Sequence, residues 1–181
     1  MLETEMKIPV ASLDAVRQRL VVGGAVRRCD LSLEDNWVLD DAAGSLRSAG
    51  RLLRLRRCGG ETLLTLKEPG QFRAGVKSRP EFETPIGSSE AMLEVLRALG
   101  FAPVRRYQKR RETWSFGKLQ VCLDETPMGA FVELEGDAAT LGPTALRLGL
   151  DPASAVAATY LELWGTFRST HPAAPEDMVF S

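Results

Sequence analysis

Histidine and cysteine are scarce in this sequence. His171 is the only histidine among 181 residues, and the three cysteines, Cys29, Cys58 and Cys122, stand far apart. No C-x-x-C or Cys/His spacing typical of zinc sites is present, so a bound metal ion would need oxygen ligands. One histidine near the C-terminus also argues against Ser-His-Asp or Cys-His catalysis, because those reactions need a histidine held beside the nucleophile.

Long apolar runs and an excess of one charge are missing too. The first residues, MLETEMKIPV, are acidic and alternating, unlike a secretory signal, and no stretch approaches the length of a membrane span. The 23 basic and 24 acidic residues leave a net charge of -1, so overall charge does not favour nucleic-acid binding. We therefore expect a cytoplasmic protein that binds neither membranes nor nucleic acid.

The remaining composition is that of an ordinary globular protein, with 44% hydrophobic and 26% charged residues. No low-complexity tract or long linker divides the chain. We expect a single domain over residues 1–170. The proline-containing segment 171–181 is predicted to be a flexible tail.

Strand-like segments that carry charge at every second position dominate the sequence. In residues 2–9, Glu3, Glu5 and Lys7 share one face and apolar residues the other. Similar alternation recurs in residues 51–57, 61–67, 79–84, 104–116, 118–124 and 129–136. Around residues 37–39 the strand signal is weak. Helical spacing predicts helices after Ser12, over residues 88–99 and over residues 153–167, so the fold class is α+β.

The charged strand faces form one set when they are taken together. Their carboxylates and cations come from at least six strand segments: Glu3, Glu5, Glu81, Glu83, Asp124, Glu133 and Glu135, with Lys7, Arg54, Arg56, Lys67, Lys109 and Arg111. Inside a closed antiparallel barrel, such faces would hold divalent cations and a polyanion. On the outer, water-facing side of a sheet, the same charged faces would simply be solvated. Alternation alone does not distinguish these two interpretations.

The order of the charged motifs resembles a known family. The motifs are E-x-E-x-K from Glu3, R-x-R from Arg54, T-L-K ending at Lys67, R-x-E-x-E from Arg79, K-x-R from Lys109, L-D at Asp124 and G-x-F-x-E-x-E from Gly129. Together they are similar to the CYTH domain, whose superfamily is also called the triphosphate tunnel metalloenzymes. Class IV adenylyl cyclase and thiamine triphosphatase give the domain its name.

This resemblance implies an eight-stranded antiparallel β-barrel with a charged lumen and covering helices. It implies Mg²⁺ or Mn²⁺ as the cofactor, with metal ligands Glu3, Glu5, Glu133, Glu135 and Asp124, and with Glu81 and Glu83 as supporting lumen carboxylates. The phosphate-binding residues would be Lys7, Arg54, Arg56, Lys67, Lys109 and Arg111. Lys7, Lys109 and Glu135 would act in catalysis.

Three functions are compatible with these residues. We favour a metal-dependent triphosphatase acting on inorganic, nucleoside or thiamine triphosphate, because nothing in the chain indicates an adenine pocket. The alternatives are a class IV-type adenylyl cyclase and a triphosphate-binding module without turnover. In each case the partner is a small molecule with a triphosphate group, and the oligomeric state stays open, a homodimer included.

One segment departs from the family pattern. Where many relatives carry D-x-Y-F-D, this chain reads DNWVLD from Asp35 to Asp40 and lacks the tyrosine. Any role that depends on this tyrosine is therefore unassigned. Trp37, Tyr107 and Tyr160 are interpreted as packing residues.

Overall fold

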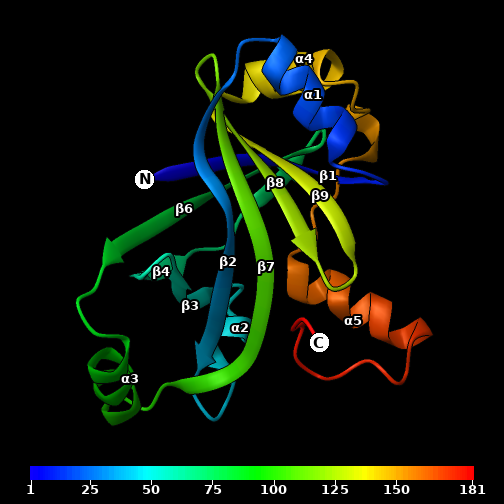
Figure 1. Cartoon of the computed structure of the whole chain (residues 1–181). Coiled ribbons are helices and arrows are strands. Elements are labelled where there is room, and N and C mark those ends of the chain that lie inside the picture. Colours follow the sequence, from blue (N-terminus) through cyan, green and yellow to red (C-terminus); the bar gives the residue numbers. More distant parts are fainter.

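A closed β-barrel forms the centre of the molecule in the computed structural model, which describes residues 1–181 (Figure 1). Eight antiparallel strands follow one another around it in the order β1-β9-β8-β7-β2-β3-β4-β6, and pairing of β1 with β6 closes the ring. The strands are β1 (Leu2–Val10), β2 (Val26–Asp40), β3 (Leu52–Cys58), β4 (Glu61–Lys67), β5 (Gln71–Arg73), β6 (Val76–Pro85), β7 (Ala102–Phe116), β8 (Leu119–Thr126) and β9 (Gly129–Glu135). Strand β5 pairs only with β6. The predicted α+β fold with an eight-stranded antiparallel barrel is confirmed.

Strand β2 is much longer than the segment around residues 37–39 that the sequence indicated. It runs for 15 residues and pairs with both β3 and β7. Its first half is mostly exposed, and its register with β7 shifts between Arg27 and Cys29 and again between Cys29 and Ser32. An exposed, irregular strand lacks the apolar alternation that marks half-buried strands, which explains the weak sequence signal.

Five α-helices and one short 3₁₀-helix connect or cover the strands (Figure 1). The helices are α1 (Asp14–Val22), α2 (Ser45–Ser48), α3 (Ser89–Ala98), α4 (Ala138–Arg147), the 3₁₀-helix Pro152–Ser154 and α5 (Tyr160–Thr170). The helix expected over residues 153–167 therefore starts later, at Tyr160, because Thr159 and Glu162 form a capping box there. No helix combines the length and apolar character needed to span a membrane.

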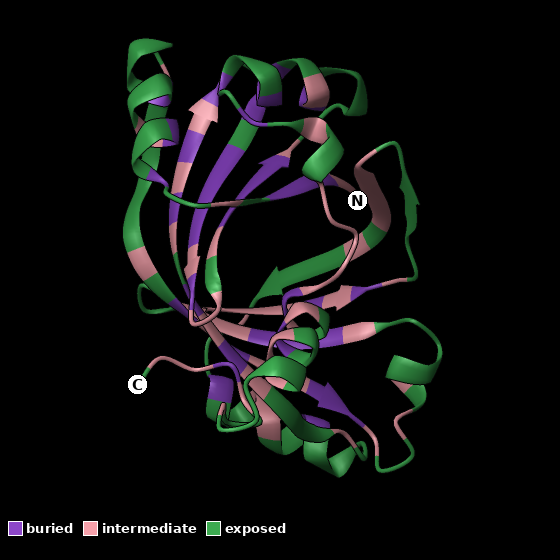
Figure 2. Ribbon diagram, turned by 90° about the vertical axis from the view of Figure 1, so that its right-hand side faces the viewer, coloured by how far each residue is buried: buried purple, intermediate pink, exposed green.

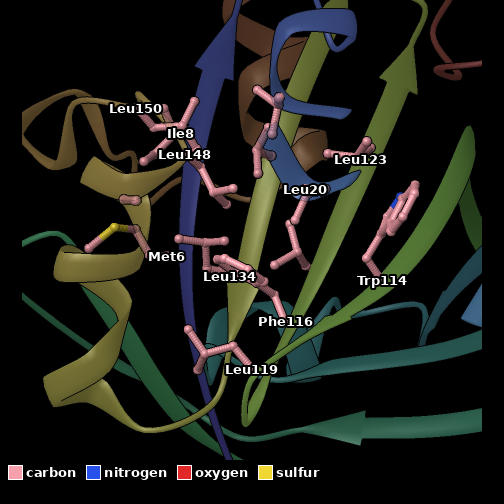
Figure 3. Packing of buried hydrophobic residues seen from close by; sticks show 14 of the residues in the cluster. Met6, Ile8, Leu20, Trp114, Phe116, Leu119, Leu123, Leu134, Leu148 and Leu150 are labelled. Atoms are coloured by element: carbon pink, nitrogen blue, oxygen red, sulfur yellow. The ribbon is translucent and has the colours of Figure 1, made fainter. Parts of the chain in front are cut away.

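The largest hydrophobic core lies outside the barrel, between its wall and the helices α1 and α4. Met6, Ile8 and Leu134 project outward from β1 and β9 and pack with Leu20 of α1 and with Leu148, just after α4 (Figure 3). All five side chains are at most 2% exposed. Figure 2 shows the buried residues concentrated on the strands, whereas the helices are largely exposed. Because apolar burial occurs outside the wall, the lumen is left for polar side chains.

The C-terminal segment 171–181 packs against the barrel, which differs from the loose tail expected from the sequence. Met178 is fully buried, and its backbone forms hydrogen bonds with Arg106 and Gln108 of β7. Strand β8 pairs with β7 only from Arg110 onward, so this part of β7 has a free edge. The tail covers that edge, and the unpaired backbone groups explain its order.

Candidate active site

The barrel encloses a cavity of about 550 Å³ whose lining is mainly polar. Twenty-five residues line it, and only seven of them are hydrophobic. Among the lining residues are twelve of those selected from the sequence: Glu3, Glu5, Lys7, Arg54, Arg56, Lys67, Glu81, Glu83, Lys109, Arg111, Glu133 and Glu135. The remaining one, Asp124, is fully buried behind the lining. The charged strand faces thus point into the barrel, and the solvated interpretation is wrong for these residues.

Asp124 on β8 is held by four hydrogen bonds from three side chains. Its Oδ2 accepts from Lys109 Nζ at 3.0 Å, from Arg111 Nη2 at 2.6 Å and from the Tyr160 hydroxyl at 2.6 Å, and its Oδ1 accepts from Arg111 Nε at 2.6 Å. Both oxygens are therefore engaged by donors. In this arrangement Asp124 orients the side chains of Lys109 and Arg111.

Glu133 on β9 is surrounded by three cations, two of which also bind Asp124. Lys7 Nζ lies 3.4 Å from one of its oxygens, Lys109 Nζ lies 3.9 Å from the other, and Arg111 forms an ion pair with it. Although burial disfavours the charged form, Lys109, Arg111 and Lys7 hold the pKa of Glu133 well below its usual range. Glu133 is thus a charged carboxylate that balances this part of the lumen.

A second ion-pair group joins β1, β4 and β6 across the closure of the barrel. Lys67 Nζ lies 2.7 Å from Glu3 and 2.8 Å from Glu81, and Arg79 Nε lies 3.1 Å from Glu3. Burial raises the pKa of Glu3, but Lys67 and Arg79 outweigh it and lower this pKa to about 2. Beside this group, Arg56 of β3 bridges Glu83 of β6 at 3.0 Å and Glu34 of β2 at 3.2 Å.

Glu5 and Glu135 differ from the other lumen carboxylates in how poorly they are compensated. Glu5 is 6% exposed and forms no hydrogen bond or ion pair with a basic side chain. Glu135 has one ion pair, at 3.6 Å from Arg111, and accepts a hydrogen bond from Gln120. Burial, together with Glu133, Glu3 and Glu5, raises the pKa of Glu135 to about 7. These two residues form an acidic pair whose only basic partner is Arg111.

This acidic pair is where a divalent cation would fit the residues present. Glu5 and Glu135 are register partners on neighbouring strands, and carboxylate oxygens are the ligands that Mg²⁺ and Mn²⁺ prefer. The side chains as they stand do not form a group of three or more His, Cys, Asp or Glu residues arranged to hold a metal ion. Glu3, Glu133 and Asp124 are instead bound to basic side chains.

Several lumen residues were not selected as site residues from the sequence. Glu34 and Asn36 lie buried on β2, Arg79 lines the cavity from β6, and Tyr107 and Tyr160 line it as well. The Tyr107 hydroxyl accepts a hydrogen bond from Arg54 at 3.2 Å. Both tyrosines therefore have polar partners in the lumen and are not packing residues alone. Because side chains alternate along β6, Arg79 lies on the same strand face as Glu81, and this spacing predicts that Arg79 also points into the lumen.

Comparison with known proteins agrees with this arrangement. The CYTH domain family model matches residues 1–159. A search of the curated proteins finds no match.

Solved structures show the same fold at low sequence identity. A candidate adenylate cyclase from Vibrio parahaemolyticus has a TM-score of 0.81 and 21% identity, covering 91% of this chain and 98% of that one. The PH1012 protein from Pyrococcus horikoshii has a TM-score of 0.75 and 22% identity, covering 89% and 98%. A candidate adenylyl cyclase from Hippeastrum, described as having a dominant triphosphatase activity, has a TM-score of 0.67 and 20% identity, covering 93% and 96%. With a family model matching most of its length, this chain belongs to the CYTH domain family.

Proposed function

We propose that the protein is a divalent-metal-dependent triphosphatase that hydrolyses inorganic triphosphate or an organic triphosphate, such as nucleoside or thiamine triphosphate. One observation carries this proposal: basic side chains from five strands converge on a cavity of about 550 Å³ inside the barrel. They are Lys7, Arg54, Arg56, Lys67, Arg79, Lys109 and Arg111. A small, multiply charged anion is the ligand that such a cavity would favour.

The basic residues would bind and align the phosphate chain. Arg54, Arg56 and Arg111 present guanidinium groups, which suit phosphate oxygens because they donate two parallel hydrogen bonds. Lys7 and Lys109 would neutralise the charge on the phosphoryl group during transfer. Phosphoryl transfer depends mainly on alignment and on charge neutralisation, so these residues would supply most of the catalysis.

Glu5 and Glu135 would hold Mg²⁺ or Mn²⁺, with Glu3 and Glu133 as the neighbouring carboxylates. When bound, the cation would supply positive charge to the phosphate oxygens and lower the pKa of water. Without the cation the pKa of Glu135 is about 7, and a bound cation would lower it, so Glu135 would be ionised and would accept a proton from the attacking water at an Oε atom. In this proposal Asp124 orients Lys109 and Arg111 and is not a metal ligand.

Product analysis by ³¹P NMR tests the proposal. The purified protein is incubated with Mg²⁺ or Mn²⁺ and with tripolyphosphate, thiamine triphosphate or ATP, and EDTA provides the metal-free control. Release of orthophosphate only with metal supports a triphosphatase. Cyclic AMP with pyrophosphate from ATP would instead identify a cyclase, and tight binding with no product would identify a binding module.

A further inference from the structure

The first turn of α5 reaches into the lumen through the side chain of Tyr160. This side chain is 6% exposed and lines the cavity, although its helix is not part of the barrel wall. Its ring packs edge-on against Phe131 of β9, with ring centroids 5.3 Å apart and an interplanar angle of 80°. The capping box of Thr159 and Glu162 fixes the backbone at this point. The ring is therefore held in one orientation.

The hydroxyl of Tyr160 donates a hydrogen bond of 2.6 Å to Asp124 Oδ2. The same oxygen accepts from Lys109 and Arg111. Asp124 is fully buried, so its position depends on these donors alone and not on solvent. A hydrogen bond to a buried charged group is worth more than one between neutral groups, and Tyr160 is the only uncharged donor of the group.

The ring face of Tyr160 also lies near two lysines. Lys7 Nζ is 4.4 Å and Lys109 Nζ is 5.1 Å from the ring centroid, both within cation–π range. The loop before the helix adds backbone acceptors: Ala158 O accepts from Lys7 Nζ at 3.1 Å, and Ala157 O accepts from Lys77 Nζ at 3.0 Å. Three of the proposed phosphate-binding cations are thus oriented by the start of α5, directly or through Asp124.

We infer that Tyr160 is a positioning residue, which through Asp124 and its ring face holds Lys7, Lys109 and Arg111 in the geometry that receives phosphate. This inference rests on the proposed function, because it assumes that Lys7, Lys109 and Arg111 bind phosphate. It assigns the start of α5, which lies outside the barrel strands, to the anion-binding site. Loss of the hydroxyl would leave the three cations in place but less well ordered, which weakens binding of a rigidly spaced polyanion more than it weakens the fold.

Titration calorimetry with tripolyphosphate, in EDTA, tests this inference without requiring turnover. We compare the wild type with Tyr160→Phe, which removes only the hydroxyl, with Asp124→Asn, and with the double variant. Trp164→Phe is the matched control, because Trp164 lies in the same hydrophobic cluster but bonds only to backbone oxygens of Pro175 and Glu176. Melting temperatures are recorded for every variant, and KM and kcat are measured with metal.

Tyr160→Phe should weaken tripolyphosphate binding about tenfold, as expected for a hydrogen bond to a charged group. KM should rise by a similar factor, while the melting temperature falls no more than in Trp164→Phe, whose affinity should stay within about twofold of wild type. The double variant should bind no more weakly than Asp124→Asn, because both changes break one network.

Two results would overturn the inference. If the wild type binds tripolyphosphate and Tyr160→Phe binds it equally well, the positioning role fails while the proposed function stands. If the wild type binds no tripolyphosphate either in EDTA or with Mg²⁺, the proposed function fails and this inference fails with it. Should it bind only with Mg²⁺, the KM values of Tyr160→Phe and Trp164→Phe make the same comparison. Should Asp124→Asn not fold, the comparison of Tyr160→Phe with Trp164→Phe still decides the matter.

Discussion

Glu5 on β1 and Glu135 on β9 face each other in register across two neighbouring strands, and neither carboxylate has a full complement of counter-charge. Like charges directly opposite each other in a sheet are destabilising. Burial is the main cause of the raised pKa of Glu135, about 7, and Glu133, Glu3 and Glu5 add to it. A divalent cation between them would supply the missing positive charge.

Glu5→Gln should abolish metal-dependent activity without destabilising the metal-free protein. No ion pair is lost by the change, and repulsion toward Glu135 is reduced. We expect the free energy of unfolding to stay within about 0.5 kcal/mol of the wild type or to rise. Mg²⁺ titration and urea denaturation provide the two measurements, and wild-type activity in the variant would exclude Glu5 as a ligand.

Glu133→Gln should behave differently, because Glu133 balances Lys7, Lys109 and Arg111. Its neutralisation removes the one ion pair of Lys7 and leaves Lys109 and Arg111 to Asp124, and breaking comparable buried pairs costs about 3–5 kcal/mol. Urea denaturation at pH 7 in metal-free buffer measures the loss, and added tripolyphosphate should restore part of it. A variant as stable as Glu5→Gln would contradict the ion-pair assignment.

Stability of the metal-free protein should depend on pH through Glu135. Its pKa in the folded state is about 7, above the usual glutamate value of 4.5, so the folded protein binds the additional proton. The resulting stability is fully present below about pH 4.5 and is lost as the pH rises through 7, with a size on the order of 3 kcal/mol. Denaturation between pH 5 and 8 should therefore show a steeper decline in the wild type than in Glu135→Gln. Equal slopes would mean that Glu135 titrates normally.

Arg79→Ala should weaken binding of the triphosphate, although Arg79 is not among the phosphate-binding residues expected from the sequence. The side chain lines the cavity and pairs with Glu3 at 3.1 Å. Loss of a charged hydrogen bond of this kind corresponds to a rise of KM of about tenfold to a hundredfold. Arg73→Ala, in the exposed strand β5, is the matched control and should leave KM unchanged. Equal effects of both changes would point to general electrostatic attraction.

Met178→Ala should destabilise the fold by about 2–5 kcal/mol, because the side chain is fully buried beside Tyr107 and Trp164. Denaturant titration of the variant measures this cost. An unchanged free energy of unfolding would mean that the C-terminal segment is as loose in solution as its composition suggested.

Most of the barrel could be predicted, because period-two alternation decides which face of a strand each residue occupies. Glu3, Glu5 and Lys7 reach the lumen for this reason, as do Glu133 and Glu135. Alternation does not decide which partner a side chain meets inside. Asp124, predicted as a metal ligand, meets Lys109, Arg111 and Tyr160 because β7 and α5 approach it from distant parts of the sequence.

The parts that sequence reasoning missed depend on long-range contacts. Strand β2 is stabilised by β3 and β7 and lacks a strong pattern of its own. The C-terminal segment is ordered by the free edge of β7, which only the assembled sheet creates. Tyr160 resembles any aromatic core residue until the position of Asp124 is known. Local propensity holds little information about such contacts.

A crystal structure with tripolyphosphate and Mn²⁺ will show whether the lumen binds a triphosphate together with a divalent cation. We predict an anomalous manganese peak beside Glu5 and Glu135 and phosphate density among Lys7, Lys109 and Arg111. Phosphate and manganese bound only on the outer surface, with the ion pairs of the lumen unchanged, would contradict the account.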